Sequence, residues 1–174
     1  MQKDTVIFEA NHDWRSTVED FLLREWFESA YSDEDIINLQ ETVYAPAVVA
    51  QKICDPEHPS KAWIALHEGK AAGMISTNDV SGGVIVKEEF RGHGIGAALT
   101  EERNNYLRSI GENHTTVQVE VNNAASLAMH MKLGYEFTQA SSDLIALNAQ
   151  SGTAIHDIRD ISGHPAIIEM TKPL

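Results

Sequence analysis

The spacing of apolar residues divides the chain into a helical first part and a strand-rich second part. Apolar residues near the start recur every three or four positions, as Val18, Phe21 and Leu22 do, and this spacing predicts helices with one buried face. After about residue 60 the pattern changes to runs and alternations of apolar residues, which predict strands that alternate with helices. The predicted strands are 5–10, 62–67, 71–77, 84–86, 115–121, 135–138 and 166–172. The predicted helices are 17–27, about 32–44, 47–53, 97–110 and 126–133.

Turn and capping residues mark the ends of these segments. Glu68-Gly69-Lys70 joins two predicted strands in a hairpin. Gly111 and Gly134 each follow a predicted helix, where glycine is favoured because it easily adopts the backbone conformation that ends a helix. Asn123 is expected to cap the helix that follows it. The segment 139–165 carries little apolar patterning and is predicted to be a long polar loop before the last strand.

Length and composition indicate one globular domain that spans residues 1–174. Of the 174 residues, 43% are apolar and 22% are charged, which is ordinary for a single domain. Cys54 is the only cysteine, so no internal disulfide can form; we expect a buried apolar role for it and a cytoplasmic protein. No apolar run is long enough for a membrane helix, and the acidic start of the chain differs from a signal peptide.

The charge of the chain is strongly negative and unevenly distributed. The net charge of −13 argues against a nucleic-acid-binding surface, which is expected to be basic. Residues 1–60 hold 13 acidic and 4 basic residues, whereas residues 61–174 hold 13 acidic and 9 basic ones. This excess is either a solvated surface that aids solubility or a wall that attracts a cationic ligand.

The segment from Val84 to Leu99 is the most informative part of the chain about function. It reads as a strand, a charged turn, a glycine-rich loop and a helix, with glycines at 92, 94 and 96. Without side chains, the loop can turn its backbone N–H groups inward to bind an anion, and the following helix points its positive end at the same place. Arg91 adds a charged donor at the rim. Together these groups suit a pyrophosphate.

The same glycines match the dinucleotide-binding pattern GxGxxG/A, with Glu120 at the place of the ribose-binding acid. Three features count against that fold. The five residues Lys87 to Arg91 separate the strand from the first glycine, where a dinucleotide fold has a tight turn. Too few residues follow for its sheet, and the pattern lies at mid-chain. A dinucleotide-binding protein therefore stays a remote alternative.

Two motifs in register resemble those of the GNAT-type N-acetyltransferases. Arg91-x-x-Gly94-x-Gly96 resembles the acetyl-CoA loop R/QxxGxG/A, and Asn123 to Tyr135 resembles the segment NxxSxxxxxKxGF/Y. The resemblance covers about residues 5–138. It implies an α/β fold with a mixed central sheet of about seven strands, helices on both faces, and two central parallel strands that splay apart. The NxxS form is similar to branches that acetylate protein N-termini.

The resemblance also implies how acetyl-CoA is held. The strand backbone would bind the pantetheine arm and the loop amides the pyrophosphate, with the thioester near Val84 and a strand N–H as oxyanion donor. Asn123 would contact the cofactor or only cap its helix. The histidines show no metal-ligand spacing, so no metal site is predicted. The implied cofactor-binding residues are Val84, Ile85, Val86, Arg91, Gly92, His93, Gly94, Ile95, Gly96, Ala97 and Asn123.

Two residues are predicted to be catalytic. Glu120 would serve as the base that removes a proton from the attacking amine, or is simply an exposed strand glutamate. His130 stands where many members of the family have a tyrosine acid, and imidazole can protonate a leaving thiolate; otherwise it is a helix residue bonded to a neighbour. Glu9, Glu25 and Glu28 are weaker candidates for the base.

The predicted activity is transfer of an acetyl group from acetyl-CoA to a primary amine through a tetrahedral intermediate, without a covalent enzyme intermediate. The acceptor is expected to be cationic, either a small molecule or a protein N-terminus or lysine, with no nucleic acid or membrane as partner. A non-catalytic acyl-CoA-binding regulatory module of the same fold is the main alternative. The segment 139–165 would cover the acceptor site or join two copies in a homodimer.

Overall fold

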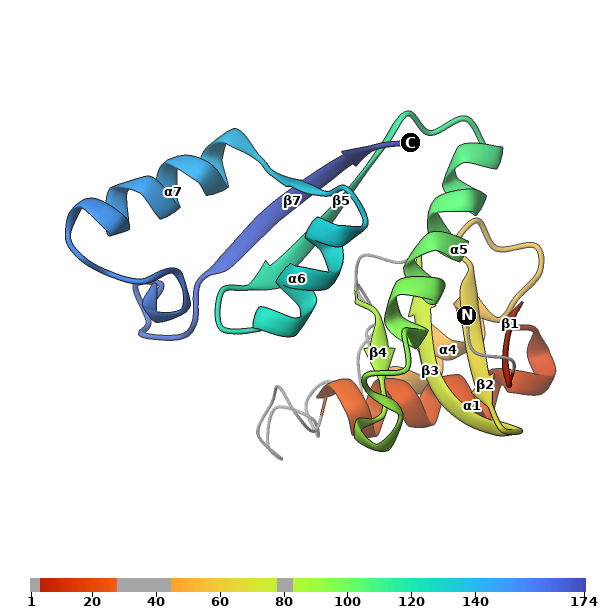
Figure 1. Ribbon diagram of the computed structural model, residues 1–174. Coiled ribbons are helices and arrows are strands. Elements are labelled where there is room, and N and C mark those ends of the chain that lie inside the picture. The colour runs from red at the N-terminus through yellow and green to blue at the C-terminus, as the bar shows by residue number, and fades with distance from the viewer. Residues whose placement is uncertain (1–3, 28–44, 78–82) are drawn as a thin grey trace. The chain divides into compact units, whose positions relative to one another are not determined.

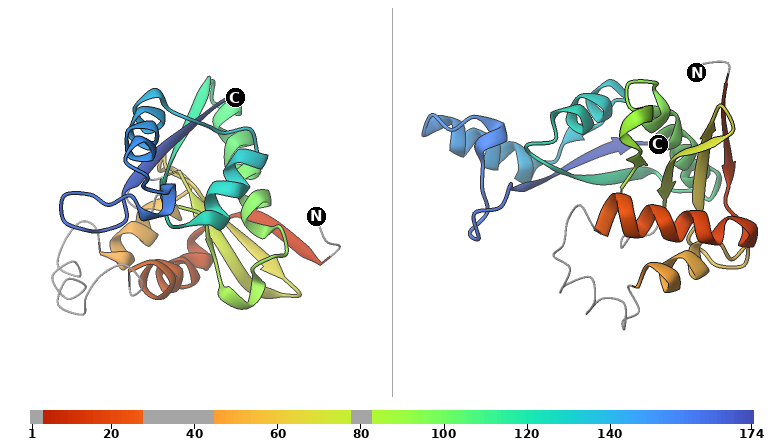
Figure 2. Two further views of the ribbon diagram at one scale, coloured as in Figure 1. Left: turned by 60° about the vertical axis from the view of Figure 1, so that its left-hand side comes forward. Right: turned by 90° about the horizontal axis from the view of Figure 1, so that it is seen from below.

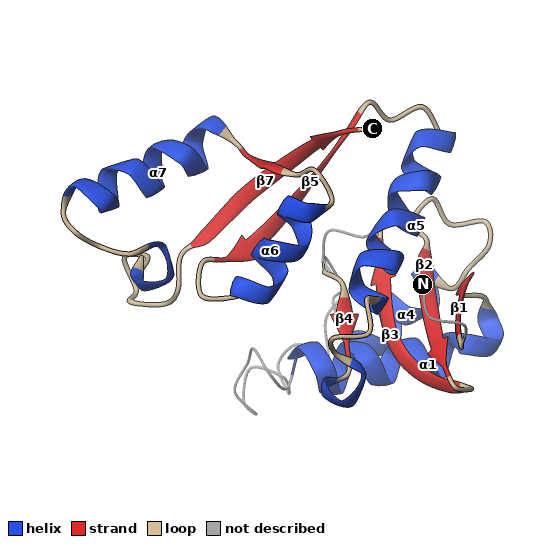
Figure 3. Ribbon diagram, in the orientation of Figure 1, coloured by secondary structure: helices blue, strands red, loops and turns tan. Residues whose placement is uncertain are grey.

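The structure is a computed structural model that describes residues 4–27, 45–77 and 83–174. These residues fall into two compact units, Met1–Asn105 and Tyr106–Leu174. Each unit contains one sheet, and helix α5 (Ile95–Ser109) begins in the first unit and ends in the second. Figure 3 colours the strands red and the helices blue. The helix predicted at about 32–44 lies outside the described residues, as does Glu28, one of the weaker candidates for the base.

The first unit is built on a four-stranded antiparallel sheet in the order β1-β2-β3-β4 (Figure 1). The strand β2 coincides with its predicted range, and five of its six residues are buried. A strand that is covered on both faces carries apolar residues at successive positions rather than alternating ones, which explains the apolar run from Ala62 to Leu66. The four strands are β1 (Thr5–Glu9), β2 (Ala62–His67), β3 (Lys70–Ser76) and β4 (Ile85–Val86).

The predicted hairpin between β2 and β3 is present, but its turn has two residues rather than three, because Lys70 already belongs to β3. Glu68 and Gly69 both have positive φ angles, of 51° and 76°. This conformation matches the twist of the two strands, and it suits Gly69 better than Glu68, whose side chain disfavours it. The backbone N–H of Glu68 donates to the carbonyl of Asp4 at 3.0 Å, which ties the turn to the start of β1.

Helices cover both faces of this sheet (Figures 1 and 2). Helices α1 and α4 pack against each other, and Val18 and Ile53 from them share one buried core with Ile64 and Met74 of the sheet. Gly73 faces the opposite way from Met74, and its position approaches α5, so α5 lies on the other face. The helices are α1 (Arg15–Asp20), which continues as a π-helical stretch η2 (Phe21–Phe27), α4 (Pro46–Ile53) and α5 (Ile95–Ser109).

The second unit is a three-stranded antiparallel sheet in the order β5-β7-β6, with β7 at its centre. Val117, Val119 and Val121 alternate with exposed residues and form a core with Ile168 and Met170. The alternation predicted for 115–121 is therefore confirmed. The elements are β5 (His114–Glu120), α6 (Ala124–Lys132), β6 (Glu136–Phe137), α7 (Gln139–Gln150) and β7 (Ile167–Pro173).

The prediction of a polar loop at 139–165 is wrong for its first twelve residues. Residues 139–150 form the helix α7, which begins after Thr138, whose side chain accepts a hydrogen bond from the N–H of Ser141. Ser141 is buried, and its hydroxyl accepts from the N–H of Glu169 at 2.8 Å. The pattern is weak because α7 presents only Leu144 and Ile145 to the core, so most of its residues are free to be small or polar.

The expected sheet is also divided. The described residues form seven strands, as predicted, but in two antiparallel sheets of four and three strands rather than one mixed sheet. The parallel, splayed pair expected from the resemblance falls on β4 and β5, which belong to different units. Their arrangement therefore stays a prediction.

Candidate cofactor-binding loop and catalytic residues

The loop singled out in the sequence connects β4 to α5. Val86 pairs with Gly73, and the N–H of Lys87 donates to the carbonyl of Ala72 at 3.0 Å, so the end of β4 is held against β3. A short 3-10 turn, Glu88–Phe90, follows. Helix α5 then begins at Ile95, which is buried. The predicted order of strand, charged turn, loop and helix is confirmed, with the helix starting two residues early.

Two glycines of the loop are required by their backbone conformation. Gly92 and Gly94 have φ angles of +81° and +74°, which residues with a side chain rarely adopt. A Cβ atom at either position would meet no atom within 4 Å. Space is therefore not the reason for these glycines, and the loop surface around them is open.

The loop leaves a row of backbone N–H groups available. The first hydrogen bond of α5 runs from the N–H of Ala98 to the carbonyl of Gly94, at 3.1 Å. Within the described parts of the chain, no acceptor is seen for the N–H groups of residues 92–97. Gly94 has no side chain with which to cap the helix. Free amides at the positive end of a fifteen-residue helix form an arrangement that binds anions.

The side chains of the loop hold it in place. The Nε of Arg91 donates to the carbonyl of Val86 at 3.3 Å, which places the guanidinium beside the end of β4. The Nδ1 of His93 lies 3.2 Å from the carbonyl oxygen of Phe90 and 3.1 Å from that of Arg91. Because carbonyls only accept, Nδ1 carries the proton. The ring of His93 is exposed, and it also takes part in the hydrogen bonding that holds the loop.

A buried histidine that residue spacing does not predict packs against two rings of the loop. His67, on β2, is only 6% exposed, and its ring lies 5.1 Å from that of His93 and 5.8 Å from that of Phe90. Its Nδ1 is hydrogen-bonded to the buried hydroxyl of Thr5 at 2.8 Å. No spacing rule links residues 5, 67 and 93, because β1, β2 and the loop come together only in the folded chain.

The second motif forms the start of α6. The side-chain oxygen of Asn123 accepts a hydrogen bond from the N–H of Ser126 at 3.1 Å, so Asn123 caps the helix. At the other end, Gly134 has a φ angle of +84° and ends the helix as expected. The structure thus establishes the capping role of Asn123, whereas its contact with a cofactor stays a prediction.

His130 lies on the buried side of α6. It is 5% exposed, and its ring meets the ring of Tyr135 edge-on at 5.1 Å. Its Nδ1 lies 2.9 Å from the carbonyl oxygen of Ser126, which assigns the proton of the neutral ring to Nδ1. Such a ring can donate a proton from Nε2 only after it has become an imidazolium.

Glu120 is exposed at the end of β5, on the face opposite Val119 and Val121 and alongside Gln118. Its backbone carbonyl accepts from the N–H of Asn123 at 2.9 Å, which forms the turn into α6. Glu120, Asn123 and His130 therefore belong to the second unit, and the glycine loop belongs to the first.

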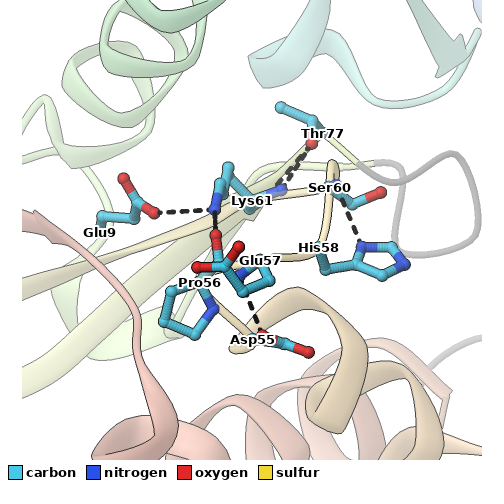
Figure 4. Close-up of polar contacts among 8 residues, drawn as sticks. All are labelled: Glu9, Asp55, Pro56, Glu57, His58, Ser60, Lys61 and Thr77. Atoms are coloured by element: carbon cyan, nitrogen blue, oxygen red, sulfur yellow. Dashed lines mark hydrogen bonds and ion pairs between the residues drawn. The ribbon is translucent and has the colours of Figure 1, made fainter.

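Some acidic residues of the first third form an ion pair or a hydrogen bond within the protein (Figure 4). The ammonium of Lys61 lies 3.5 Å from a carboxylate oxygen of Glu9 and also donates to the carbonyl of Pro56. A carboxylate oxygen of Asp55 accepts from the N–H of Glu57 at 2.9 Å. Glu9 is therefore a poorer candidate for a base than Glu120. The side chain of Glu25 lies outside the described residues.

Cys54 is fully buried in the core of the first unit. Burial raises the pKa of its thiol from the ordinary value of 9.0 to about 11, although the positive charge of Arg15 acts in the opposite direction. A thiol with this pKa is not a nucleophile near neutral pH. Across the described ranges, no group of three or more histidine, cysteine or acidic residues is placed to hold a metal ion, and no helix could span a bilayer.

Comparison with known proteins identifies the family. Residues 17–135, more than half of the chain, match the model of the acetyltransferase (GNAT) family, and the chain therefore belongs to this family. Acetyl-CoA-dependent acyl transfer is the general activity of the family. A search of curated proteins finds no match.

Solved structures with the same fold cover nearly the whole chain. PaiA N-acetyltransferase from Thermoplasma acidophilum, in complex with coenzyme A, is 15% identical with a TM-score of 0.66, over 98% of this chain and 99% of that one. A putative acetyltransferase from Salmonella typhimurium with its cofactor acetyl-CoA is 14% identical with a TM-score of 0.60, over 99% and 95%. The ribosomal-protein-S18-alanine N-acetyltransferase from Escherichia coli is 15% identical with a TM-score of 0.56, over 97% and 93%.

Proposed function

We propose that this chain transfers the acetyl group of acetyl-CoA to a primary amine of a cationic acceptor. The observation that carries the proposal is the row of open amides at residues 92–97, at the start of a long helix and inside the region that matches the family. Two structures of the same fold were solved with coenzyme A or acetyl-CoA, which contain the pyrophosphate that such a loop suits.

The residues of the first unit would bind the acyl donor. The amides of Gly92 to Ala97 hold the pyrophosphate, and the guanidinium of Arg91 adds a charged donor beside it. The backbone of Val84 to Val86 pairs with the pantetheine arm as a neighbouring strand would. A backbone N–H of this strand stabilises the negative charge that develops on the thioester oxygen when the amine attacks.

Glu120 would act as the base. An amine with a pKa of about 10.4 is protonated near pH 7, and removing that proton costs about 4–5 kcal/mol. The exposed carboxylate of Glu120, at the end of β5, accepts this proton directly or through water, so that the nitrogen lone pair becomes free to attack.

His130 would act as the acid. When the carbon–sulfur bond of the thioester breaks, the sulfur leaves with the electron pair and takes up a proton. The Nδ1–H of His130 stays bonded to the Ser126 carbonyl, so the imidazolium gives up the proton from Nε2 and returns to the neutral ring. Since a thiolate is already a fair leaving group, this step helps turnover without being indispensable.

A cationic acceptor is supported by charge. The chain has a net charge of −13, and most of that excess lies in residues 1–60. Both small amines and protein amines fit this chemistry. One protein of the same fold acts on the alanine of a ribosomal protein, which keeps a protein N-terminus among the candidate acceptors.

A mass-shift screen tests the proposal. The purified chain is incubated with acetyl-CoA and, separately, a polyamine, an aminoglycoside, a lysine-containing peptide and a peptide with a free N-terminal alanine. We expect free coenzyme A and one added acetyl group on at least one acceptor. Tight binding of acetyl-CoA without coenzyme A release over the whole panel would favour the non-catalytic module, and binding of a nicotinamide dinucleotide in its place would favour the remote alternative.

A further inference from the structure

The contact between β3 and β4 is unusually close at Gly73. In the register of the two strands, Gly73 lies opposite Val86 and Met74 lies opposite Ile85. The strand β4 has only two residues, and beyond it the N–H of Lys87 donates to the carbonyl of Ala72. These few interactions hold the segment to which the proposed function assigns the pantetheine arm.

A side chain at position 73 would not fit. A Cβ atom there would lie 2.6 Å from the carbonyl oxygen of Ile85, 3.2 Å from Cδ1 of Leu99 and 3.3 Å from Cγ2 of Val86. The Leu99 and Val86 atoms end side chains and can adjust by a few tenths of an ångström. The Ile85 oxygen belongs to the backbone, so the strand itself would have to move.

The requirement at Gly73 differs from that at Gly92 and Gly94. Those two glycines are needed because their φ angles are positive, whereas Gly73 is needed because another backbone comes too close. Gly83, ten residues later and directly before Val84, is constrained in neither way, since a Cβ atom there would meet nothing within 4 Å. Gly83 therefore provides a matched control.

We infer that Gly73 is a positioning residue for acyl-donor binding, an inference that rests on the proposed function. By letting β3 approach the Ile85 carbonyl and Leu99 together, Gly73 sets the distance between β4 and α5. The strand β4 would hold the pantetheine arm, and α5 follows the loop that would hold the pyrophosphate. Gly73 thus sets the spacing between the strand that would bind the pantetheine arm and the loop that would bind the pyrophosphate of the same ligand.

Two ligands separate this role from a general loss of structure. Acetyl-CoA has both the arm and the pyrophosphate, whereas adenosine 3′-phosphate 5′-diphosphate has the pyrophosphate but no arm. Gly73→Ala is expected to weaken acetyl-CoA binding about tenfold or more, because small displacements of binding groups have effects of this size. The variant should bind the nucleotide fragment as the wild type does, and Gly83→Ala should bind both ligands normally.

A second pair of variants tests the same strand without crowding the core. Lys87 has a φ angle of −56°, which proline also adopts, so Lys87→Pro removes the N–H that donates to Ala72 without distorting the backbone. Lys87→Ala keeps that N–H and removes only the side chain. Lys87→Pro should weaken acetyl-CoA binding selectively, by a smaller factor than Gly73→Ala, and Lys87→Ala should not.

Calorimetry of all four variants, with denaturant unfolding as a check of folding, decides between the outcomes. Selective loss of acetyl-CoA binding in Gly73→Ala, or in Lys87→Pro if Gly73→Ala does not fold, supports the inference. Unchanged binding in a folded Gly73→Ala, or equal loss of both ligands, overturns it. A wild-type chain that binds neither ligand would overturn the proposed function itself.

Discussion

Two junctions between a strand and a helix carry the family's two motifs, and they are built in opposite ways. At the junction between β4 and α5 the helix begins after Gly94, which has no side chain to cap it, and no backbone acceptor for its first amides is seen among the described residues. At the junction between β5 and α6 the side chain of Asn123 accepts from the N–H of Ser126. The first junction leaves its positive end open for an anion, whereas the second closes it with a residue of its own.

The residues of a motif can therefore serve either to bind a ligand or to stabilise the helix on which they lie. A cap such as Asn123 stabilises a helix by about 1 kcal/mol. The first junction forgoes that gain, and its loop is held instead by His93, which rests on the buried pair of His67 and Thr5. Because these side chains hold the loop, its backbone amides do not have to take part in holding it and stay available to a ligand.

The largest effect is expected from closing the first junction with Gly94→Asp. The carboxylate would occupy the open amides and repel a diphosphate, so acetyl-CoA binding should weaken roughly a hundredfold, or about 2–3 kcal/mol. The free energy of unfolding should change by less than about 1 kcal/mol, because two effects oppose each other. An acidic residue at a helix N-terminus is stabilising, whereas the positive φ angle of position 94 is unfavourable for any residue with a side chain. Calorimetry and denaturant unfolding measure the two quantities.

Gly152→Asp is the matched control for that variant. Gly152 has a φ angle of +77° and no atom within 4 Å of a Cβ position, so it reproduces the strain of Gly94→Asp in a different loop. It should bind acetyl-CoA as the wild type does. Equal binding by the two variants would show that the first junction is not the anion site.

A smaller effect, on turnover, is expected at the second junction. His130→Phe preserves the buried ring that packs on Tyr135 but removes the proton donor, so kcat should fall about tenfold without vanishing, and the KM for acetyl-CoA should hardly change. Coenzyme A release measures both constants. A folded variant with full activity would show that His130 is not the acid. Complete loss of activity in a folded variant would show that the acid is indispensable, contrary to the prediction.

Removing the cap of the second junction should affect stability more than binding. Asn123→Ala loses the hydrogen bond to Ser126 and should lower the free energy of unfolding by about 1 kcal/mol. Asn123→Asp retains a capping oxygen and should be close to the wild type. Weakened acetyl-CoA binding in Asn123→Ala, with unchanged stability, would instead assign this side chain to the cofactor.

The smallest expected effect is a loss of stability at high pH, caused by the buried thiol of Cys54 in the core of the first unit. Because the pKa of the Cys54 thiol is raised to about 11 in the folded chain, the unfolded thiol ionises first as the pH rises. The folded chain therefore loses stability above pH 9, by less than about 1 kcal/mol up to pH 9.5. Unfolding at pH 8 and pH 9.5 should show this loss in the wild type and Gly94→Asp, but not in Cys54→Ala.

Local pattern predicted most of the elements because their signals are short-range. The strand at 62–67 is apolar from Ala62 to Leu66, the segment 115–121 alternates, and the glycine loop requires positive φ angles that few other residues adopt. The helix α7 was missed since Leu144 and Ile145 are its only apolar residues that pack against the core, and its buried Ser141 is polar, which leaves too few apolar positions for a helical period. The early start of α5, at Ile95, reflects a helix that begins directly after a glycine.

The amino-acid sequence by itself determined the order of strands and helices, the open loop at 92–97 and the exposed face on which Glu120 lies, because each depends on neighbours in the chain. Only the tertiary structure decided that Gly73 is needed for space, that His67 and Thr5 support the loop, and that the Nδ1 of His130 is bound to Ser126. The first two depend on strands far apart in sequence, and the third on a side-chain rotation that residue spacing does not specify.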